Sequence, residues 1–439
     1  MIDDLSIEQL IDALAKKAKP KYILSMREFV PGKTIIPYSG PWFDEREIAA
    51  AIKSIATGKW ISNGESTFRF QTAFAKQFNV KHSQMVNSGS SANLMLITAL
   101  KKRLGWKDGD EVIVSPVGFP TTIAPIVQNN LKPVFVDIEM DTLNFNVDLI
   151  PGKITDRTRA IFVSPVLGNP PNMDKLLNLV GWRGLMPSPG IKLIGDNCDS
   201  LGTKWNGAQL SDSYLAWTTS FYVAHHLSTM EGGMVSSNDE ELMKLVRSFS
   251  WWGRACYCVG QANLLSCGTC GIRFSKHLAD VDAIVDHKYV FENMGYNLKP
   301  LDLQGAIGLA QMEKWAEIEA KRRLHKIKLE QLLNEYVPQV KVANKLDAAD
   351  PCWFGVPIIC DTHAIKEKLV AHLEANKIQT RNYFAGNLLR HPGYKHLDDA
   401  NKYPNADKAL THVFFIGCPP FYTEAVFQYI KEVLQKWKS

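Results

Sequence analysis

The sequence predicts an α/β protein: a large domain built around a mostly parallel sheet, followed by a smaller α+β domain. Two observations carry this prediction. Between about residues 80 and 240, short apolar segments of strand length alternate with helical patterns. Several of these apolar segments are nearly continuous, which is typical of strands covered on both faces by helices.

Residues 1–35 are expected to form a helical extension before the large domain. Ser6-Ile7-Glu8-Gln9 has the pattern of a capping box at the start of a short amphipathic helix. No secretory signal and no apolar segment of about 18 residues is seen, so we expect a cytoplasmic protein without a membrane span. In that reducing compartment, clustered cysteines favour a metal over disulfides.

The large domain is expected to span residues 36–300. Its predicted strands are Ser83–Val86, Glu111–Ser115, Pro133–Asp137, Ala160–Pro165, Lys192–Asp196, Tyr214–Ser220 and Met234–Ser236, and Ser91–Leu104 and Met173–Val180 are connecting helices. Residues 250–275 interrupt the alternation with a segment rich in Gly and Cys. A long irregular segment inside a compact domain usually serves a function.

The smaller domain is expected to span residues 301–439. It begins with a long helix, Leu303–Leu333, which ends before Pro338. The predicted strands Gln339–Val342 and Trp353–Ile359 follow, and the helix Thr423–Trp437 closes the domain.

Charge and composition exclude some partners. The chain is 46% hydrophobic and 22% charged, and its net charge of +5 comes from scattered Lys and Arg. The densest basic segment, Lys321-Arg322-Arg323, follows acidic residues and is interpreted as one solvated helix face. No basic stripe alternates with aromatic residues, so we expect no nucleic-acid partner.

Four polar segments follow predicted strands, at the edge where open α/β sheets bind ligands. Asn87–Ala92 leads into a helix, whose free N–H groups suit a phosphate. Phe119 could stack on a flat heterocycle, although a core position is the alternative. Asp196 could pair with a protonated ring nitrogen. Ser220 and His225 form the fourth segment.

Taken in this order, the segments resemble the DegT/DnrJ/EryC1/StrS family of sugar aminotransferases. The shared pattern is Ser-Gly-Ser-Ser, an aromatic turn, a strand-end Asp, and Ser-Phe-x-x-x-(Lys or His) before x-Glu-Gly-Gly. The resemblance runs from about Ile36 to the end of the chain. It implies the aspartate aminotransferase fold, fold type I, and pyridoxal phosphate as cofactor.

The resemblance also implies roles for individual residues. Gly89, Ser90, Ser91 and Ser220 are expected at the cofactor phosphate, with Asn297 supplied by the second subunit of a homodimer. Phe119 is expected to stack on the pyridine ring. Asp196 is expected to bind the ring nitrogen and keep it protonated. A site shared in this way requires at least a dimer.

His225 stands where the family has its lysine. An imidazole cannot hold the cofactor covalently but can act as a general base near neutral pH. This feature resembles the lysine-lacking 3-dehydratases of the family. It implies non-covalently held pyridoxamine phosphate and removal of the C3 hydroxyl from a nucleotide-linked 4-keto-6-deoxyhexose in deoxysugar biosynthesis. The neighbouring His226 is interpreted as a packed residue. The alternative is a non-catalytic relative that binds a partner.

Cysteine spacing separates two kinds of 3-dehydratase. Cys198, Cys256 and Cys258 match the spacing of three ligands of a [2Fe–2S] cluster in the branch that acts on CDP-4-keto-6-deoxyglucose. Such a cluster needs four thiolates. Cys270 is the expected fourth ligand, with Cys267 as its rival. A zinc site is the competing interpretation, since Cys267 and Cys270 have zinc-like spacing.

The two kinds differ in their source of electrons. The cluster type implies a separate NADH-dependent flavin and iron–sulfur reductase as a partner. The alternative is a metal-free, glutamate-dependent GDP-4-keto-6-deoxymannose 3-dehydratase, which leaves the cysteine spacing unexplained. Trp60–Gly64 resembles the segment that lines the sugar site in this family, and Arg381 is a candidate for a phosphate or sugar hydroxyl.

Overall fold

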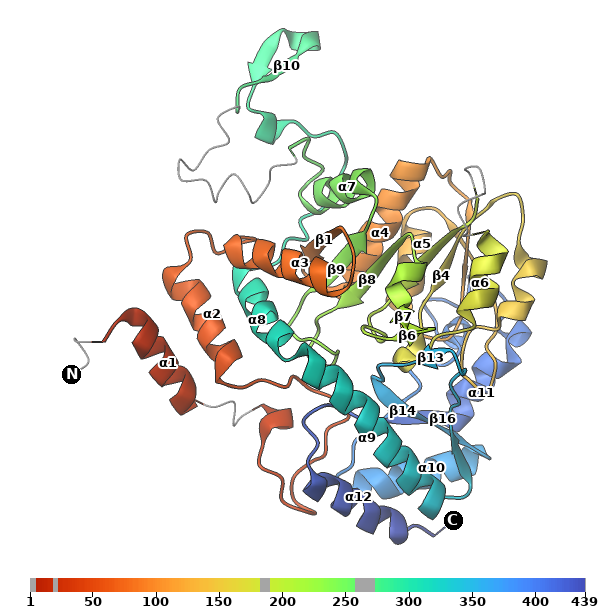
Figure 1. Ribbon diagram of the computed structural model, residues 1–439. Helices are drawn as coiled ribbons and strands as arrows, with labels where there is room; N and C mark the ends of the chain where they lie inside the picture. The colour runs from red at the N-terminus through yellow and green to blue at the C-terminus, as the bar shows by residue number, and fades with distance from the viewer. Residues whose placement is uncertain (1–4, 19–22, 182–189, 257–272, 439) are drawn as a thin grey trace.

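A seven-stranded sheet forms the centre of the large domain (Figure 1), in the order β1-β9-β8-β5-β4-β2-β3. The computed structural model describes residues 5–18, 23–181, 190–256 and 273–438. The strands are β1 (His82–Val86), β2 (Glu111–Val114), β3 (Lys132–Phe135), β4 (Thr158–Val163), β5 (Lys192–Asp196), β8 (Ala216–Ser220) and β9 (Gly233–Ser237). Neighbouring strands from β8 to β3 are parallel, and β9 is antiparallel to both β1 and β8. The predicted mostly parallel sheet is confirmed.

Apolar side chains cover both faces of this sheet. Within β4, Ala160 and Phe162 belong to one core, and Ile161 and Val163 belong to the other. Alternate residues of a strand point to opposite faces, so two covered faces require a continuous apolar segment. The first core is completed by α4 (Gly89–Leu104), α5 (Pro120–Gln128) and α7 (Glu240–Ser250), and the second by α3 (Glu65–Gln77) and α6 (Met173–Val180).

The C-terminal part contains a four-stranded antiparallel sheet, in the order β12-β14-β16-β15. Its strands are β12 (Val340–Val342), β14 (Gly355–Cys360), β15 (Thr380–Asn382) and β16 (Val413–Gly417), and its helices are α10 (His363–Ala375), α11 (Pro404–His412) and α12 (Glu424–Gln435). A third core lies here and includes Cys360 and Cys418. A small sheet of β6 (Lys204–Trp205), β7 (Ala208–Gln209) and β13 (Ala349–Asp350) links the two parts. The domain boundaries stay a prediction.

The predicted single helix Leu303–Leu333 is wrong. Two helices, α8 (Asp302–Glu313) and α9 (Trp315–Tyr336), run nearly in line and meet at Lys314 (Figure 1). Lys314 has φ −96° and ψ 0°, which departs from helical values. Its ammonium group is buried and lies 2.6 Å from the Glu47 carboxylate of α2 (Glu45–Thr57). The interruption therefore coincides with a buried ion pair that ties α2 to the α8–α9 junction.

The N-terminal segment forms the expected helix, α1 (Ile7–Ala18), which packs on α2 (Figure 1). The capping box is confirmed, because the Ser6 N–H donates to Gln9 Oε1 and the Gln9 N–H donates to Ser6 Oγ. None of the helices in the described ranges is long and apolar enough to cross a membrane.

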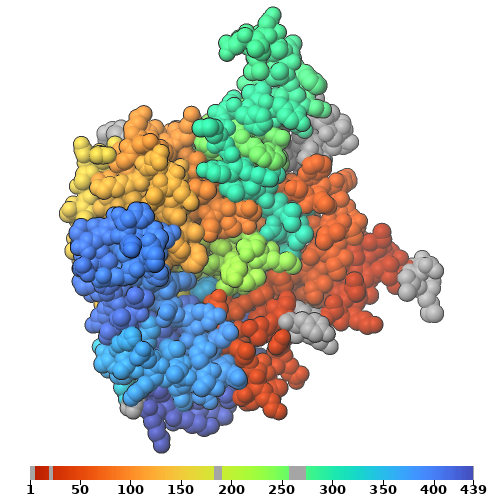
Figure 2. Space-filling model, turned by 180° about the vertical axis from the view of Figure 1, so that it is seen from behind, coloured from red at the N-terminus to blue at the C-terminus, as the bar shows by residue number. Residues whose placement is uncertain are grey.

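A hairpin projects from the large domain beyond α7 (Figures 1 and 2). It consists of β10 (Lys276–Leu278) and β11 (Ala283–Val285). It follows the predicted Cys-rich excursion at 250–275, most of which lies outside the described residues.

Candidate active site

A cavity of about 610 Å³ lies at the carboxyl ends of β4, β5 and β8 and is closed by side chains of the C-terminal part. The predicted site residues that line it are Gly89, Ser90, Phe119, Asp196, Cys198, Ser220 and His225. From the C-terminal part come Phe354, Arg381, Asn382, Phe384 and Phe415. With Arg381, eight residues singled out by sequence are thus brought together from separate segments.

The N-terminus of α4 faces this cavity. Ser88 caps the helix, and its hydroxyl oxygen accepts a hydrogen bond from the Ser91 N–H at 3.0 Å. Ser91 belongs to this cap and does not line the cavity. A Cβ on Gly89 would lie 2.4 Å from the Cβ of Ser220, so only glycine lets Ser220 approach the helix end. Free N–H groups, the helix dipole and a serine hydroxyl together suit a phosphate.

Asp196 is held in a fixed orientation at the end of β5. Its Oδ2 accepts hydrogen bonds from Asn93 Nδ2 at 2.8 Å and Thr122 Oγ1 at 2.7 Å. Its Oδ1 accepts one from the Cys198 N–H at 3.2 Å. A carboxylate oriented in this way fits the protonated nitrogen of a pyridine ring. Sequence reasoning missed Asn93 and Thr122, because each is an ordinary polar residue within a helix.

Phe119 is not a core residue: 54% of its surface is exposed, at the edge of the cavity. Its ring meets Phe384 edge to face, with centroids 6.4 Å apart. The exposed ring is available for stacking on a flat ligand. Arg381 also lines the cavity, and its guanidinium lies 4.1 Å from the ring centre of Tyr38.

His225 lies in the loop between the antiparallel neighbours β8 and β9. Burial, followed by the charge of Arg322, lowers the pKa of His225 to about 3. The ring is therefore neutral at pH 7 and has a lone pair to act as a base. Burial raises the pKa of the neighbouring Asp199 carboxyl to about 7. Asp199 lies three residues after Asp196 in the sequence, and sequence analysis gave it no role.

His226 lies in the core and does not line the cavity. Its Nε2 is 2.8 Å from the carbonyl oxygen of Cys352. The guanidinium of Arg322 donates to the carbonyls of His225, Trp353 and Phe354. Together these contacts tie the loop of His225 to the segment that leads into β14.

The predicted solvated face at Lys321–Arg323 is wrong for Arg322, which is 1% exposed. Its partners are backbone carbonyls that lie far from it in the sequence. A buried arginine cannot be distinguished by sequence from its exposed neighbours when its partners are backbone atoms.

Two of the four predicted cluster cysteines are described. Cys198 lines the cavity and Cys256 is buried after α7, while Cys258, Cys267 and Cys270 lie outside the described residues. Burial, and then the Asp196 carboxylate, raises the pKa of the Cys198 thiol well above its usual range. Among the described side chains, no group of three or more His, Cys, Asp and Glu is arranged to hold a metal ion. The described residues therefore do not assemble a cluster site.

Asn297 is exposed and does not line the cavity of its own chain. Its side-chain oxygen accepts a hydrogen bond from Lys299, which lies over the ring of Trp252. Trp60 lines a separate hollow together with residues of α2, α3 and α8. Neither segment meets the cavity within one chain.

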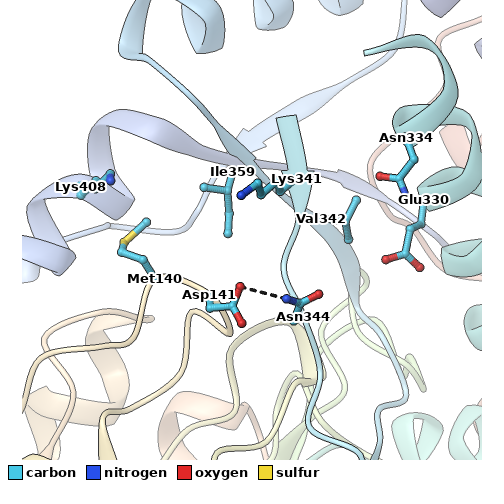
Figure 3. Close-up of a pocket in the computed structure, with 9 residues that line it drawn as sticks. All are labelled: Met140, Asp141, Glu330, Asn334, Lys341, Val342, Asn344, Ile359 and Lys408. Carbon is cyan, nitrogen blue, oxygen red and sulfur yellow. Dashed lines mark hydrogen bonds between the residues drawn. The ribbon is translucent and has the colours of Figure 1, made fainter. Parts of the chain in front are cut away.

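A second cavity of about 430 Å³ lies between α9, the strands β12 and β14, and the loop at Met140 (Figure 3). Asn344 donates to Asp141 across its floor (Figure 3). None of the predicted site residues lines it. The cavity at the carboxyl ends of the strands is therefore the candidate active site.

Comparison with known proteins gives the same fold. The chain is 35% identical to the lipopolysaccharide biosynthesis protein RfbH of Salmonella typhimurium, over 97% of this chain and 95% of that protein. It is 36% identical to the dTDP-4-dehydro-2,6-dideoxy-D-glucose 3-dehydratase of Saccharopolyspora spinosa, over 96% of this chain and 92% of that protein. The structure of E. coli GDP-4-keto-6-deoxy-D-mannose-3-dehydratase with bound hydrated PLP superposes with a TM-score of 0.78 at 30% identity, covering 91% of this chain and 98% of that one. A further structure of a GDP-4-keto-6-deoxymannose-3-dehydratase holds a trapped PLP–glutamate geminal diamine. It matches at 29% identity with a TM-score of 0.77, covering 91% of this chain and 99% of that one.

The predicted fold type I architecture, the fold of the pyridoxal phosphate-dependent aminotransferases, is confirmed. The model of the DegT/DnrJ/EryC1/StrS aminotransferase family matches residues 43–435. The chain therefore belongs to the DegT/DnrJ/EryC1/StrS aminotransferase family.

Proposed function

We propose that the protein removes the C3 hydroxyl group of a nucleotide-linked 4-keto-6-deoxyhexose, with pyridoxamine phosphate held non-covalently. The observation that carries this proposal is His225, an imidazole at the wall of the cavity where the family has a lysine. Relatives named as 3-dehydratases support the same reaction class.

The residues present fit the cofactor. The N-terminus of α4 and the Ser220 hydroxyl would hold the phosphate, Asp196 would bind the ring nitrogen, and Phe119 would cover one face of the ring. The chemistry that pyridoxamine phosphate supplies is an amine for the sugar ketone and a ring that accepts electrons.

His225 would then move one proton. As a neutral base it would accept a proton from the methylene carbon of the cofactor, and as imidazolium it would give that proton to the departing C3 hydroxyl. The proton and the hydroxide would leave together as water. Phe354 and Phe384 cover the cavity from the C-terminal part and limit the entry of bulk water.

Completion of the deoxygenation requires two electrons. The comparisons favour glutamate as their source, because the related structure that holds a PLP–glutamate adduct is a GDP-sugar 3-dehydratase. Those relatives described above whose names include a nucleotide sugar are named for dTDP- or GDP-linked sugars, which favours these over the CDP-linked sugar expected from the cysteines. We therefore propose a glutamate-dependent reaction. A [2Fe–2S] enzyme with a partner reductase is the second candidate, and it depends on the spacing of Cys198, Cys256 and Cys258.

The test is an anaerobic assay of the full chain with pyridoxamine phosphate and either GDP-4-keto-6-deoxymannose or CDP-4-keto-6-deoxyglucose, with and without glutamate. Mass spectrometry should show loss of water and a 3-deoxy product that requires glutamate. His225→Asn should slow the reaction about 10²-fold or more. His325→Asn is the matched control, because His325 is buried and bonded to a carbonyl outside the cavity.

Three results would change the proposal. An aminated sugar as the main product would replace dehydration by transamination. Roughly two iron and two sulfide per chain, with activity only after addition of a reductase, would establish the cluster instead of glutamate. No reaction of either sugar and no binding of the cofactor would favour a non-catalytic partner-binding protein.

We also propose a homodimer in which each chain supplies Asn297 to the cavity of the other. The exposed position of Asn297 supports this, as do the large apolar side chains beside it. Met294 is 97% exposed and Tyr296 is 41% exposed. Contiguous exposed apolar side chains of this kind mark a protein interface.

A further inference from the structure

The Nδ1 atom of His225 is buried and has no partner in hydrogen-bond geometry among the described residues, while the backbone of Cys198 also lies against the ring and acts to raise its pKa. Asp199 Oδ1 lies 3.5 Å away. Catalytic hydrogen bonds are often this long before the ligand binds, and they tighten in the complex. We propose that Asp199 is a positioning residue that accepts the Nδ1–H of His225 and so leaves Nε2 as the basic nitrogen. This inference rests on the proposed function of His225 as a base.

The Asp199 carboxylate is oriented from its other side by a backbone turn. Its Oδ2 accepts a hydrogen bond from the Leu167 N–H at 3.2 Å. Leu167 has φ 55° and ψ 15°, a left-handed conformation that is strained for a residue with a branched side chain. The Leu167 carbonyl in turn accepts from the Phe354 N–H at 3.0 Å. The strained residue is thus fixed between Asp199 and the segment beside His225.

Gly168 allows these segments to approach one another. It has φ +98°, and a Cβ at this position would lie 2.6 Å from the Cys352 carbonyl oxygen and 3.1 Å from that of Asp199. The turn after β4, the loop after β5 and the segment before β14 therefore meet in close contact at the base of the cavity. Because one carboxylate oxygen is held by the Leu167 N–H, Asp199 has its second oxygen available for His225.

This geometry determines which ring nitrogen carries the proton. A neutral imidazole exists as two tautomers, and a hydrogen bond at one nitrogen selects between them. In Asp199→Asn, the side-chain oxygen should remain on the Leu167 N–H and the NH₂ group should face His225. An NH₂ donor favours an unprotonated Nδ1 and moves the proton to Nε2. The variant thus keeps the shape of the site and removes the base.

The test uses the full chain with ¹⁵N-labelled histidine, both without cofactor and with pyridoxamine phosphate bound. Two-dimensional NMR distinguishes the two tautomers, and the His225 signals are those missing from His225→Asn. We expect the Nδ1–H form in the natural protein and the Nε2–H form in Asp199→Asn. The control is Asp137→Asn: Asp137 is a buried carboxylate that accepts from the Asn405 and Ala406 N–H groups away from the cavity, and its change should leave the His225 signals unaltered.

A second readout follows proton transfer. Asp199→Asn should slow exchange of solvent deuterium into the methylene group of the bound cofactor about 10²-fold or more, with the KM for the sugar unchanged. A His225 that carries its proton on Nε2 in the natural protein would overturn the inference, even if the variant does not fold. So would a variant with unchanged His225 signals. If the tautomer depends on Asp199 but no sugar is dehydrated, the positioning role stands and the proposed function fails.

Discussion

The candidate active site and the segment after α7 are built in opposite ways. In the cavity, Asp196 has three hydrogen-bond donors from the same chain, and the loop of His225 is tied by Arg322. The segment after α7, residues 251–256 and 273–301, exposes large apolar side chains such as Met294 and Tyr289, which are 97% and 68% exposed. The side chains around Asp196 and His225 are thus held by the chain itself, whereas the segment after α7 exposes apolar surface of the kind that marks protein interfaces.

The largest effect is expected from Arg322→Met, which removes the buried cation behind the cavity. Three carbonyls lose their donor and the Asp199 carboxylate loses a nearby positive charge, so the free energy of unfolding should fall by about 3–5 kcal/mol. Urea denaturation measures this. The neighbouring Lys321→Met, which removes an exposed pair with Glu317, should cost no more than about 1 kcal/mol. An equal loss of unfolding free energy in the two variants would show that Arg322 contributes no more to stability than its exposed neighbour.

Gly89→Ala should next break the phosphate end of the cavity without affecting the segment after α7. The added methyl group would overlap Ser220 and displace it, which we expect to weaken binding of pyridoxamine phosphate about 10²-fold. Equilibrium dialysis measures the Kd. Gly152→Ala is the control, since a Cβ there meets nothing within 4 Å. Unchanged affinity in Gly89→Ala would remove α4 from the cofactor site.

Met294→Glu tests whether the exposed apolar segment after α7 forms the dimer interface. A glutamate in an apolar interface loses the burial energy of the methionine, about 1.5–3 kcal/mol, so the dimer Kd should rise at least about tenfold. Sedimentation measures this. Leu149→Glu, at an exposed apolar position in the turn Val147–Leu149 of the large domain, should leave association unchanged. A monomeric natural protein would contradict the shared site.

The smallest effect is expected from Ser220 and Ser91, two serines that sequence analysis assigns to the same cofactor phosphate. Ser220→Ala removes a hydroxyl that lines the cavity and should weaken cofactor binding about tenfold. Ser91→Ala should change the Kd by less than about threefold, because the structure places Ser91 in the cap of α4. A larger effect at Ser91 than at Ser220 would restore the assignment made from sequence.

Elements with a clear hydrophobic period were predictable from the sequence. Within β4, residues 160–163 form a continuous apolar segment because both faces of the sheet are covered. The residues at the strand ends were found because ligand chemistry concentrates at that edge. For Phe119 the sequence allowed two interpretations, a buried core residue or an exposed ring that stacks on a ligand. The exposure of a side chain depends on tertiary packing, which the local sequence does not reveal.

The supporting groups of the site could not be predicted in the same way. Asn93 and Arg322 act on partners about a hundred residues away, and their own neighbourhoods are ordinary helix. The same holds for the break at Lys314, which coincides with an ion pair to a buried carboxylate on α2. Long-range pairing of polar groups leaves no period in the sequence, so only the folded structure shows it.

The cavity draws its lining from Tyr38 at one end of the chain to Phe415 near the other. A ligand bound there is therefore lost when any large part of the molecule unfolds, and its binding energy stabilises the whole fold. At a cofactor concentration one hundred times the Kd, this linkage adds about 2.7 kcal/mol. Without a lysine to retain the cofactor covalently, that stabilisation falls on dilution. The melting temperature of the protein should thus depend on how much free cofactor surrounds it.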